Sequence, residues 1–291
     1  MTVVTVRHRT AYRYANSVQF GVYRLMIRLR DSHDLRLLDT ALAIQPAASV
    51  RWLHDVFGNS VAIASFSEPG RELVFDSTIR VEQFPVAERE VVLDVYALRY
   101  PFSYPVEEIP DLARTIERAY PDPWHKVDTW ARWFVEADRS RSTLDILTGM
   151  TRSIQYQFAY ARREEMGTQT PVQTLESRSG NCRDFALFMM EAVRSLGLAA
   201  RFVSGYLSSG RPAVGGSGLV GGGETHAWVQ VYLPGAGWIE FDPTNGLVGG
   251  NDLIRVAVTR DPSQAVPLSG TFSGAPGDFL GMSVEVNVTA G

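Results

Sequence analysis

Cys182 is the single cysteine of the chain and its first candidate nucleophile. It stands at the predicted start of a helix, because apolar residues from Phe185 to Leu196 recur at helical spacing and Gly197 supplies a stop. The unpaired N–H groups in the first turn of a helix favour a thiolate. A lone cysteine on an apolar helix face can equally be an inert packing residue, so nucleophilic chemistry requires a base within reach.

His226 is the candidate base, and it opens an alternating segment that ends at Leu233. Along this segment His226, Trp228 and Gln230 share one predicted strand face, while the apolar residues between them form a core-facing one. An imidazole that takes the proton of a thiol needs an acceptor to orient it. Without the cysteine, His226 would be interpreted as a hydrogen-bonded structural histidine.

Asp242 is the candidate acceptor, at the end of the next apolar segment. Strand parity sets a condition on it. With a four-residue turn over 234–237, Asp242 would oppose Val229 on the core face; with an odd turn or a bulge, it would share the face of His226. The hypothesis of a Cys–His–Asp site therefore requires an odd turn or a bulge. Otherwise Asp242 would simply be a turn-forming residue before a proline.

The elements that must position these residues fall into successive parts of the chain. Residues 1–88 alternate like strands separated by turns, which predicts an antiparallel β-sandwich domain. Proline-rich residues 89–124 are predicted to be a connector. Residues 125–250 combine helical periodicity with alternating segments and form the predicted catalytic domain, with a loop over the Gly/Ser-rich stretch 208–223. Residues 251–291 are predicted to supply C-terminal strands that pack on the preceding domains.

The composition is that of an ordinary globular protein, with 45% hydrophobic and 21% charged residues. A net charge of -4 disfavours nucleic acid as a partner. Apolar runs stay below the roughly 20 residues of a membrane span, so no membrane partner is expected. The N-terminus alternates and lacks the apolar core of a signal peptide, which predicts a cytoplasmic location. One cysteine excludes an internal disulfide framework and a cysteine-rich zinc site.

Three segments carry a resemblance to a known family. They read SGNCRDFA around the cysteine, HAWVQV from the histidine, and GWIEFDPT around the aspartate. These segments resemble the nucleophile, histidine and aspartate segments of bacterial transglutaminase-like proteins, in the same order. The β-rich first part resembles the N-terminal region that precedes this domain in many bacterial members. Together the resemblance covers nearly the whole chain.

The resemblance implies an α+β fold in which a papain-like catalytic domain follows the β-sandwich. It implies that Cys182 is the nucleophile, His226 the general base and acid, and Asp242 the orienting group. An oxyanion hole needs donors near the thiol, and the backbone N–H of Cys182 is one. The remaining site predictions are residues at the oxyanion or the substrate, where packing or surface roles are the alternatives: Gln157, Tyr156 and Trp228.

The expected reaction is thiolate attack on a carboxamide carbonyl of a protein or peptide, with release of ammonia or an amine and formation of a thioester. Hydrolysis of the thioester is expected rather than amine transfer, because the chain shows no dedicated acyl-acceptor feature; a transglutaminase is the alternative. The resemblance supplies no cofactor and no metal. Two other hypotheses are a catalytically silent peptide-binding module and a metal site formed by the same three side chains. The sequence does not specify an oligomeric state.

Overall fold

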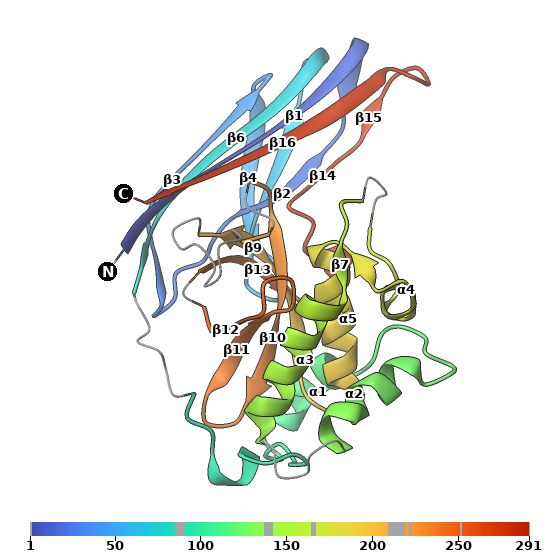
Figure 1. Ribbon diagram of the computed structural model, residues 1–291. Coiled ribbons are helices and arrows are strands. Elements are labelled where there is room, and N and C mark those ends of the chain that lie inside the picture. Colours follow the sequence, from blue (N-terminus) through green and yellow to red (C-terminus); the bar gives the residue numbers. More distant parts are fainter. Residues whose placement is uncertain are drawn as a thin grey trace.

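A computed structural model describes residues 2–84, 91–136, 142–163, 167–208, 219–220, 223–250 and 252–290. An all-β unit stands against a second unit of helices packed on a sheet (Figure 1). The predicted α+β class with an N-terminal antiparallel β-sandwich is confirmed. The predicted boundary at residue 88 and most of the predicted loop over 208–223 lie outside the described residues.

The β-sandwich consists of two antiparallel sheets. The first contains β15 (Phe272–Ser273), β1 (Thr2–Phe20), β6 (Gly70–Gln83) and β3 (Leu35–Gln45), and β16 (Phe279–Ala290) also pairs with β1. The second has the order β14 (Leu268–Ser269), β2 (Tyr23–Arg28), β5 (Ser60–Phe66) and β4 (Ala48–His54). β4 and β5 form a hairpin, and its turn contains Gly58, whose φ of 76° is suited to glycine.

Alternation explains why these segments form a sandwich. Every second residue of β1 and β6 points inward, where Phe20, Phe75 and Leu73 are buried. They pack against Tyr23 and Leu25 of β2 in one apolar cluster between the sheets. The sandwich therefore has a core of its own, separate from that of the helical unit.

Five α-helices lie among the described residues of the second unit. They are α1 (Ile109–Ile116), α2 (Lys126–Glu136), α3 (Thr143–Gln157), α4 (Pro171–Ser177) and α5 (Cys182–Ser195). A capping box begins α3: the Ser142 hydroxyl accepts from the N–H of Asp145 at 3.1 Å, and the Asp145 carboxylate accepts from the N–H of Ser142. No helix in the described ranges has the length and apolar character needed to cross a membrane.

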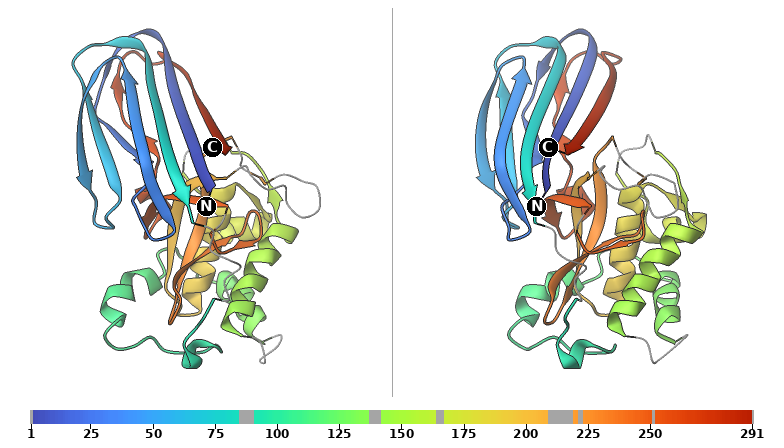
Figure 2. Two further views of the ribbon diagram at one scale, coloured as in Figure 1. Left: turned by 90° about the vertical axis from the view of Figure 1, so that its left-hand side faces the viewer. Right: turned by 60° about the vertical axis from the view of Figure 1, so that its left-hand side comes forward.

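An antiparallel sheet lies behind α5, with the order β12 (Leu247–Val248), β11 (Gly237–Asp242), β10 (His226–Leu233), β9 (Ala200–Leu207) and β13 (Leu253–Thr259). Its core face carries Ala227, Val229 and Phe202, which share one apolar cluster with the buried face of α5. Figure 2 shows α5 standing beside this sheet, with α3 alongside it. This packing brings the N-terminus of α5 to the sheet end where β10 begins.

The last part of the chain divides between the two units. β13 completes the sheet behind α5 by pairing with β9, and the chain then returns to the sandwich. There β14 pairs with β2, and β16 pairs with β1 from Val4 to Tyr14. The two termini consequently lie near one another, as both views in Figure 2 show. The sandwich is thus built from both ends of the sequence.

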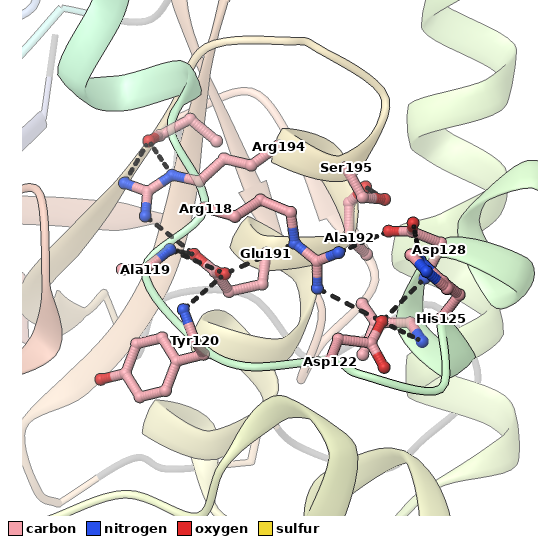
Figure 3. Close-up of polar contacts among 12 residues, drawn as sticks. Arg118, Ala119, Tyr120, Asp122, His125, Asp128, Glu191, Ala192, Arg194 and Ser195 are labelled. Atoms are coloured by element: carbon pink, nitrogen blue, oxygen red, sulfur yellow. Dashed lines mark hydrogen bonds and ion pairs between the residues drawn. The ribbon is translucent and has the colours of Figure 1, made fainter.

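A buried cluster of charged residues holds the C-terminal half of α5 in place (Figure 3). The Glu191 carboxylate, fully buried, accepts from the N–H groups of Ala119 and Tyr120 and from Arg194 Nη1 at 2.9 Å. Arg194 also donates to the carbonyls of Thr115, Ala200 and Arg260. Since each buried charge has partners, the cluster locks α5 to the loop after α1 and to β9.

His8 joins the two units. On β1, its Nδ1 lies 2.8 Å from the hydroxyl of Tyr206 on β9, and its Nε2 lies 3.0 Å from the Thr10 hydroxyl. Burial lowers the pKa of His8 to about 4, from an ordinary value of 6.5. The folded protein therefore holds this histidine neutral, with both ring nitrogens hydrogen-bonded.

Protonation of His8 is expected to make the fold acid-sensitive. Because the folded pKa is the lower one, the contribution of His8 to stability is fully present above pH 6.5 and is lost as pH falls towards 4, by about 3 kcal/mol. His8→Gln keeps hydrogen-bonding groups but does not titrate. Urea unfolding of both proteins from pH 7 to pH 4 should show the variant gaining stability relative to the wild type; parallel pH curves would contradict this.

Candidate active site

An asparagine cap places Cys182 at the first position of α5. The Asn181 side-chain oxygen accepts from the N–H groups of Arg183 at 3.0 Å and Asp184 at 3.1 Å, and the Asp184 carboxylate accepts from the N–H of Asn181. This capping box ends the preceding strand and starts the helix at the cysteine. Cys182 is buried, at 6% exposed, with the positive end of the helix beneath it.

Asp184 and Arg183, which follow the cysteine, are held by structural contacts. The buried Asp184 carboxylate also accepts from Arg163 at 2.9 Å and from the N–H of Gln169 at 2.7 Å. Arg183 points to the segment after β13, where it donates to the Pro262 carbonyl at 2.6 Å. These contacts fix the loop and the helix start around Cys182.

A three-residue turn satisfies the parity condition for Asp242. Leu233 pairs with Gly237 across the turn, and Val229 pairs with Phe241 further along. The next step of the same register places Asp242 opposite Trp228, on the face of His226. The odd turn is possible because Gly235 and Gly237 both adopt positive φ, 86° and 74°.

His226 and Asp242 form a fully buried pair. His226 Nε2 donates to Asp242 Oδ2 at 2.8 Å. The carboxylate is held in turn by the Asn245 amide at 2.8 Å and by the N–H of Thr244 at 2.9 Å. Two partners beyond the histidine therefore fix the orientation of the acceptor.

The second ring nitrogen of His226, Nδ1, is not bound by Asp242. Nδ1 is buried and makes no hydrogen bond of ordinary geometry to any described residue, and Cys182 lies close enough to affect its titration. Burial by itself would lower the pKa of His226, but the charge and hydrogen bond of Asp242, with a smaller contribution from Cys182, raise it to about 10. Burial likewise opposes ionisation of Asp242, yet the charge of His226 holds the pKa of Asp242 below its usual value. The pair is thus an imidazolium–carboxylate at neutral pH.

Tyr160 is a site residue that sequence reasoning missed. It lies on β7 (Ala159–Tyr160), which pairs in parallel with β8 (Ser179–Gly180) just before Cys182, so that Tyr160 opposes Gly180. Its hydroxyl lies close enough to Cys182 for that cysteine, together with burial, to raise the pKa of Tyr160 to about 12. The hydroxyl therefore stays protonated and available as a donor. The pairing is long-range and only two residues long, so no local pattern indicates it.

The other predicted site residues lie elsewhere. Tyr156, 79% exposed, and Gln157, also exposed, stand at the end of α3, whereas Tyr160 is the residue close to the thiol. Trp228 is fully buried, and its indole N–H is donated to Glu240, so it does not line a surface cleft. Its ring stacks on His226 with centroids 5.9 Å apart. Within the described ranges, no three His, Cys, Asp or Glu side chains are placed to hold a metal ion.

A cysteine at a helix N-terminus, beside a histidine–aspartate pair on an antiparallel sheet, defines a cysteine-dependent enzyme of the papain-like kind. Residues 112–243 match the model of the transglutaminase-like superfamily, and residues 4–82 match the bacterial transglutaminase-like N-terminal region. The second unit is therefore a transglutaminase-like core, and the first is a bacterial transglutaminase-like N-terminal region.

Similar proteins span most of the chain. An uncharacterized protein of Mycobacterium leprae is 28% identical over 298 residues, which cover 97% of each chain. A protein-glutamine gamma-glutamyltransferase of Pseudomonas aeruginosa is 38% identical over 69 residues, 24% of this chain and 10% of that protein. Among solved structures, a candidate cysteine protease from Cytophaga hutchinsonii has a TM-score of 0.69 at 19% identity and covers 99% of this chain and 90% of its own. This last similarity establishes the shared fold over both units.

Asp242→Asn is expected to neutralise His226 at pH 7.5. The substitution removes the charge that outweighs burial, so the pKa of His226 should fall below neutrality. Nitrogen-15 NMR of the imidazole side chains reports this directly, and only five histidines need assignment. A doubly protonated ring in the wild type and a neutral ring in the variant are expected. A neutral His226 in the wild type at this pH would refute the imidazolium assignment.

Proposed function

We propose that the protein is a cysteine-dependent amide-bond enzyme, in which Cys182 is the nucleophile, His226 the general base and acid, and Asp242 the orienting carboxylate. One observation carries the proposal: His226 is held through Nε2 by a buried carboxylate while its Nδ1 faces a helix-capped cysteine. A structural histidine has no need of both contacts. A silent binding module has no need to bury an ion pair beside a thiol.

In the proposed reaction the Cys182 proton already resides on Nδ1 of the His226 imidazolium, so Cys182 is the thiolate that attacks. The thiolate attacks the carbonyl carbon of a protein or peptide carboxamide, and the imidazolium returns the proton to the departing ammonia or amine. The acyl group remains on the sulfur as a thioester. Water or a second amine, deprotonated by His226, then attacks the thioester and releases the thiol.

Two donors are proposed for the oxyanion of the tetrahedral intermediate. One is the backbone N–H of Cys182 at the helix start, and the other is the Tyr160 hydroxyl, which replaces Gln157 or Tyr156 in that role. Tyr160 is suited to it because it stands beside the thiol and its hydroxyl stays protonated.

Hydrolysis is the proposed outcome. The sequence shows no dedicated acyl-acceptor feature, and Tyr160 beside the thiol is 37% exposed. Amine transfer is the second candidate, favoured by the match to the Pseudomonas aeruginosa protein-glutamine gamma-glutamyltransferase across about a quarter of the chain. Both outcomes share the same thioester.

The reactivity of Cys182 tests the proposed Cys–His pair. At pH 6, wild-type Cys182 is expected to react with iodoacetamide on the order of 10- to 100-fold faster than in His226→Ala, because an imidazolium maintains the thiolate where an ordinary thiol is almost wholly protonated. Cys182→Ser, which has no thiol, sets the background. Equal, slow alkylation of wild type and His226→Ala would refute the enzyme assignment. Ammonia release from glutamine peptides, with and without an added amine, then distinguishes hydrolysis from transfer.

Tyr160→Phe tests the second oxyanion donor. The variant keeps the ring that packs at 6.4 Å from Phe185 but loses the hydroxyl. We expect kcat on a peptide amide to fall by about 10²- to 10³-fold with little change in KM. Gln157→Ala, the matched test of the donor predicted from sequence, is expected to leave kcat unchanged. The reverse pattern would restore Gln157 to the site and exclude Tyr160.

A further inference from the structure

A chain of polar contacts runs from the β-sandwich to the back of the candidate catalytic histidine. It lies on the sheet face opposite α5, and it consists of Asp34, Arg255, Glu240 and Trp228. The proposed reaction uses none of these residues. We call these four residues the Glu240 chain.

Trp228 is the end of the Glu240 chain that contacts His226. The two rings are two residues apart on β10, stack with an interplanar angle of 27°, and are both buried. Gly205 lies opposite His226 on β9, and a Cβ there would be 2.6 Å from the Trp228 ring. The glycine thus provides the space that the indole occupies, which leaves the imidazole plane against the indole.

Glu240 holds the indole in place. Its Oε2 accepts the indole N–H of Trp228, and its Oε1 accepts from the Gln230 amide and from Arg255 Nη1, each at 2.6 Å. Glu240 is 6% exposed. A buried carboxylate with three donors has little freedom to move, so the indole that it anchors is fixed as well.

Arg255 connects Glu240 to the sandwich. Its Nη2 donates to Asp34 Oδ1 at 3.1 Å and to the Ser32 hydroxyl at 3.2 Å. Ser32 and Asp34 lie in the loop between β2 and β3, within the sandwich. Arg255 is therefore clamped between two carboxylates, one from each unit of the protein.

We infer that the β-sandwich positions the imidazole of His226 through the Glu240 chain, which makes Trp228, Glu240, Arg255 and Asp34 positioning residues for the Cys–His pair. The hydrogen bond to Asp242 fixes one atom of the ring, and stacking on Trp228 fixes its plane, so Nδ1 is kept facing Cys182. This inference rests on the proposed function, because it assigns the sandwich a role in thiol activation rather than in stability alone.

A double-mutant cycle on the alkylation rate of Cys182 tests the inference in the full-length chain. Trp228→Phe keeps a stacking ring but loses the N–H anchor, and Asp34→Ala releases Arg255 from the sandwich. Each is expected to slow reaction with iodoacetamide at pH 6 by about 3- to 10-fold. The double variant is expected to be no slower than the slower single variant, because both substitutions interrupt the same chain of contacts.

The matched control is Tyr206→Phe, which removes another contact between the units. Among the described residues, the Tyr206 hydroxyl hydrogen-bonds to His8 across the same junction and to no member of the Glu240 chain. This variant is expected to lose thermal stability while its alkylation rate stays at the wild-type value. If Asp34→Ala does not fold, Asp34→Asn removes the charge while keeping the size of the side chain and carries the same cycle.

Two results would overturn the inference. One is wild-type alkylation in Asp34→Ala or Asp34→Asn; the other is a double-variant loss equal to the product of the two single losses. Neither result is confused with failure of the proposed function. That failure shows earlier, as wild-type alkylation that is slow and indifferent to His226→Ala.

Discussion

The buried ion pair between His226 and Asp242 is the constraint on which the rest of the structure depends. Removing both charges from water costs several kcal/mol for each, and only close, well-oriented partners offset this. The pair therefore requires an odd turn between β10 and β11, and it requires Asn245 and Thr244 to satisfy the remaining oxygens of Asp242. A sheet that meets these requirements places His226 at the start of β10, close to Cys182.

Helix α5 supplies the cysteine that lies beside His226. Its apolar face packs on the sheet, Glu191 and Arg194 anchor its C-terminal half, and the Asn181 cap fixes its first residue. Each contact limits a different motion of the helix: its separation from the sheet, a shift of its C-terminal half, and fraying of its first turn. Cys182 is thereby positioned near His226 by packing.

The β-sandwich is more than an appended domain. Its sheets are completed by strands from the C-terminal part of the chain, which has already contributed β13 to the catalytic sheet. His8 and Asp34 then contact that sheet from the sandwich side. The contact of Asp34 is the one through which we infer that the sandwich positions His226.

Local sequence determined much of this protein. Alternation predicted the sandwich strands, periodicity with a cap and a glycine stop predicted α5, and chain parity reduced the question of Asp242 to one turn. These features depend on neighbours within a few residues, so a single sequence displays them. Tertiary structure alone decided which aromatic residues enter the site: Tyr160 approaches Cys182 through a two-residue pairing with β8, whereas Tyr156, four residues earlier, faces solvent. It also decided that Trp228 lies behind His226, because Gly205 and Glu240, distant in sequence, make its space and hold its N–H. Contacts between segments that only folding brings together leave no periodic pattern along the chain.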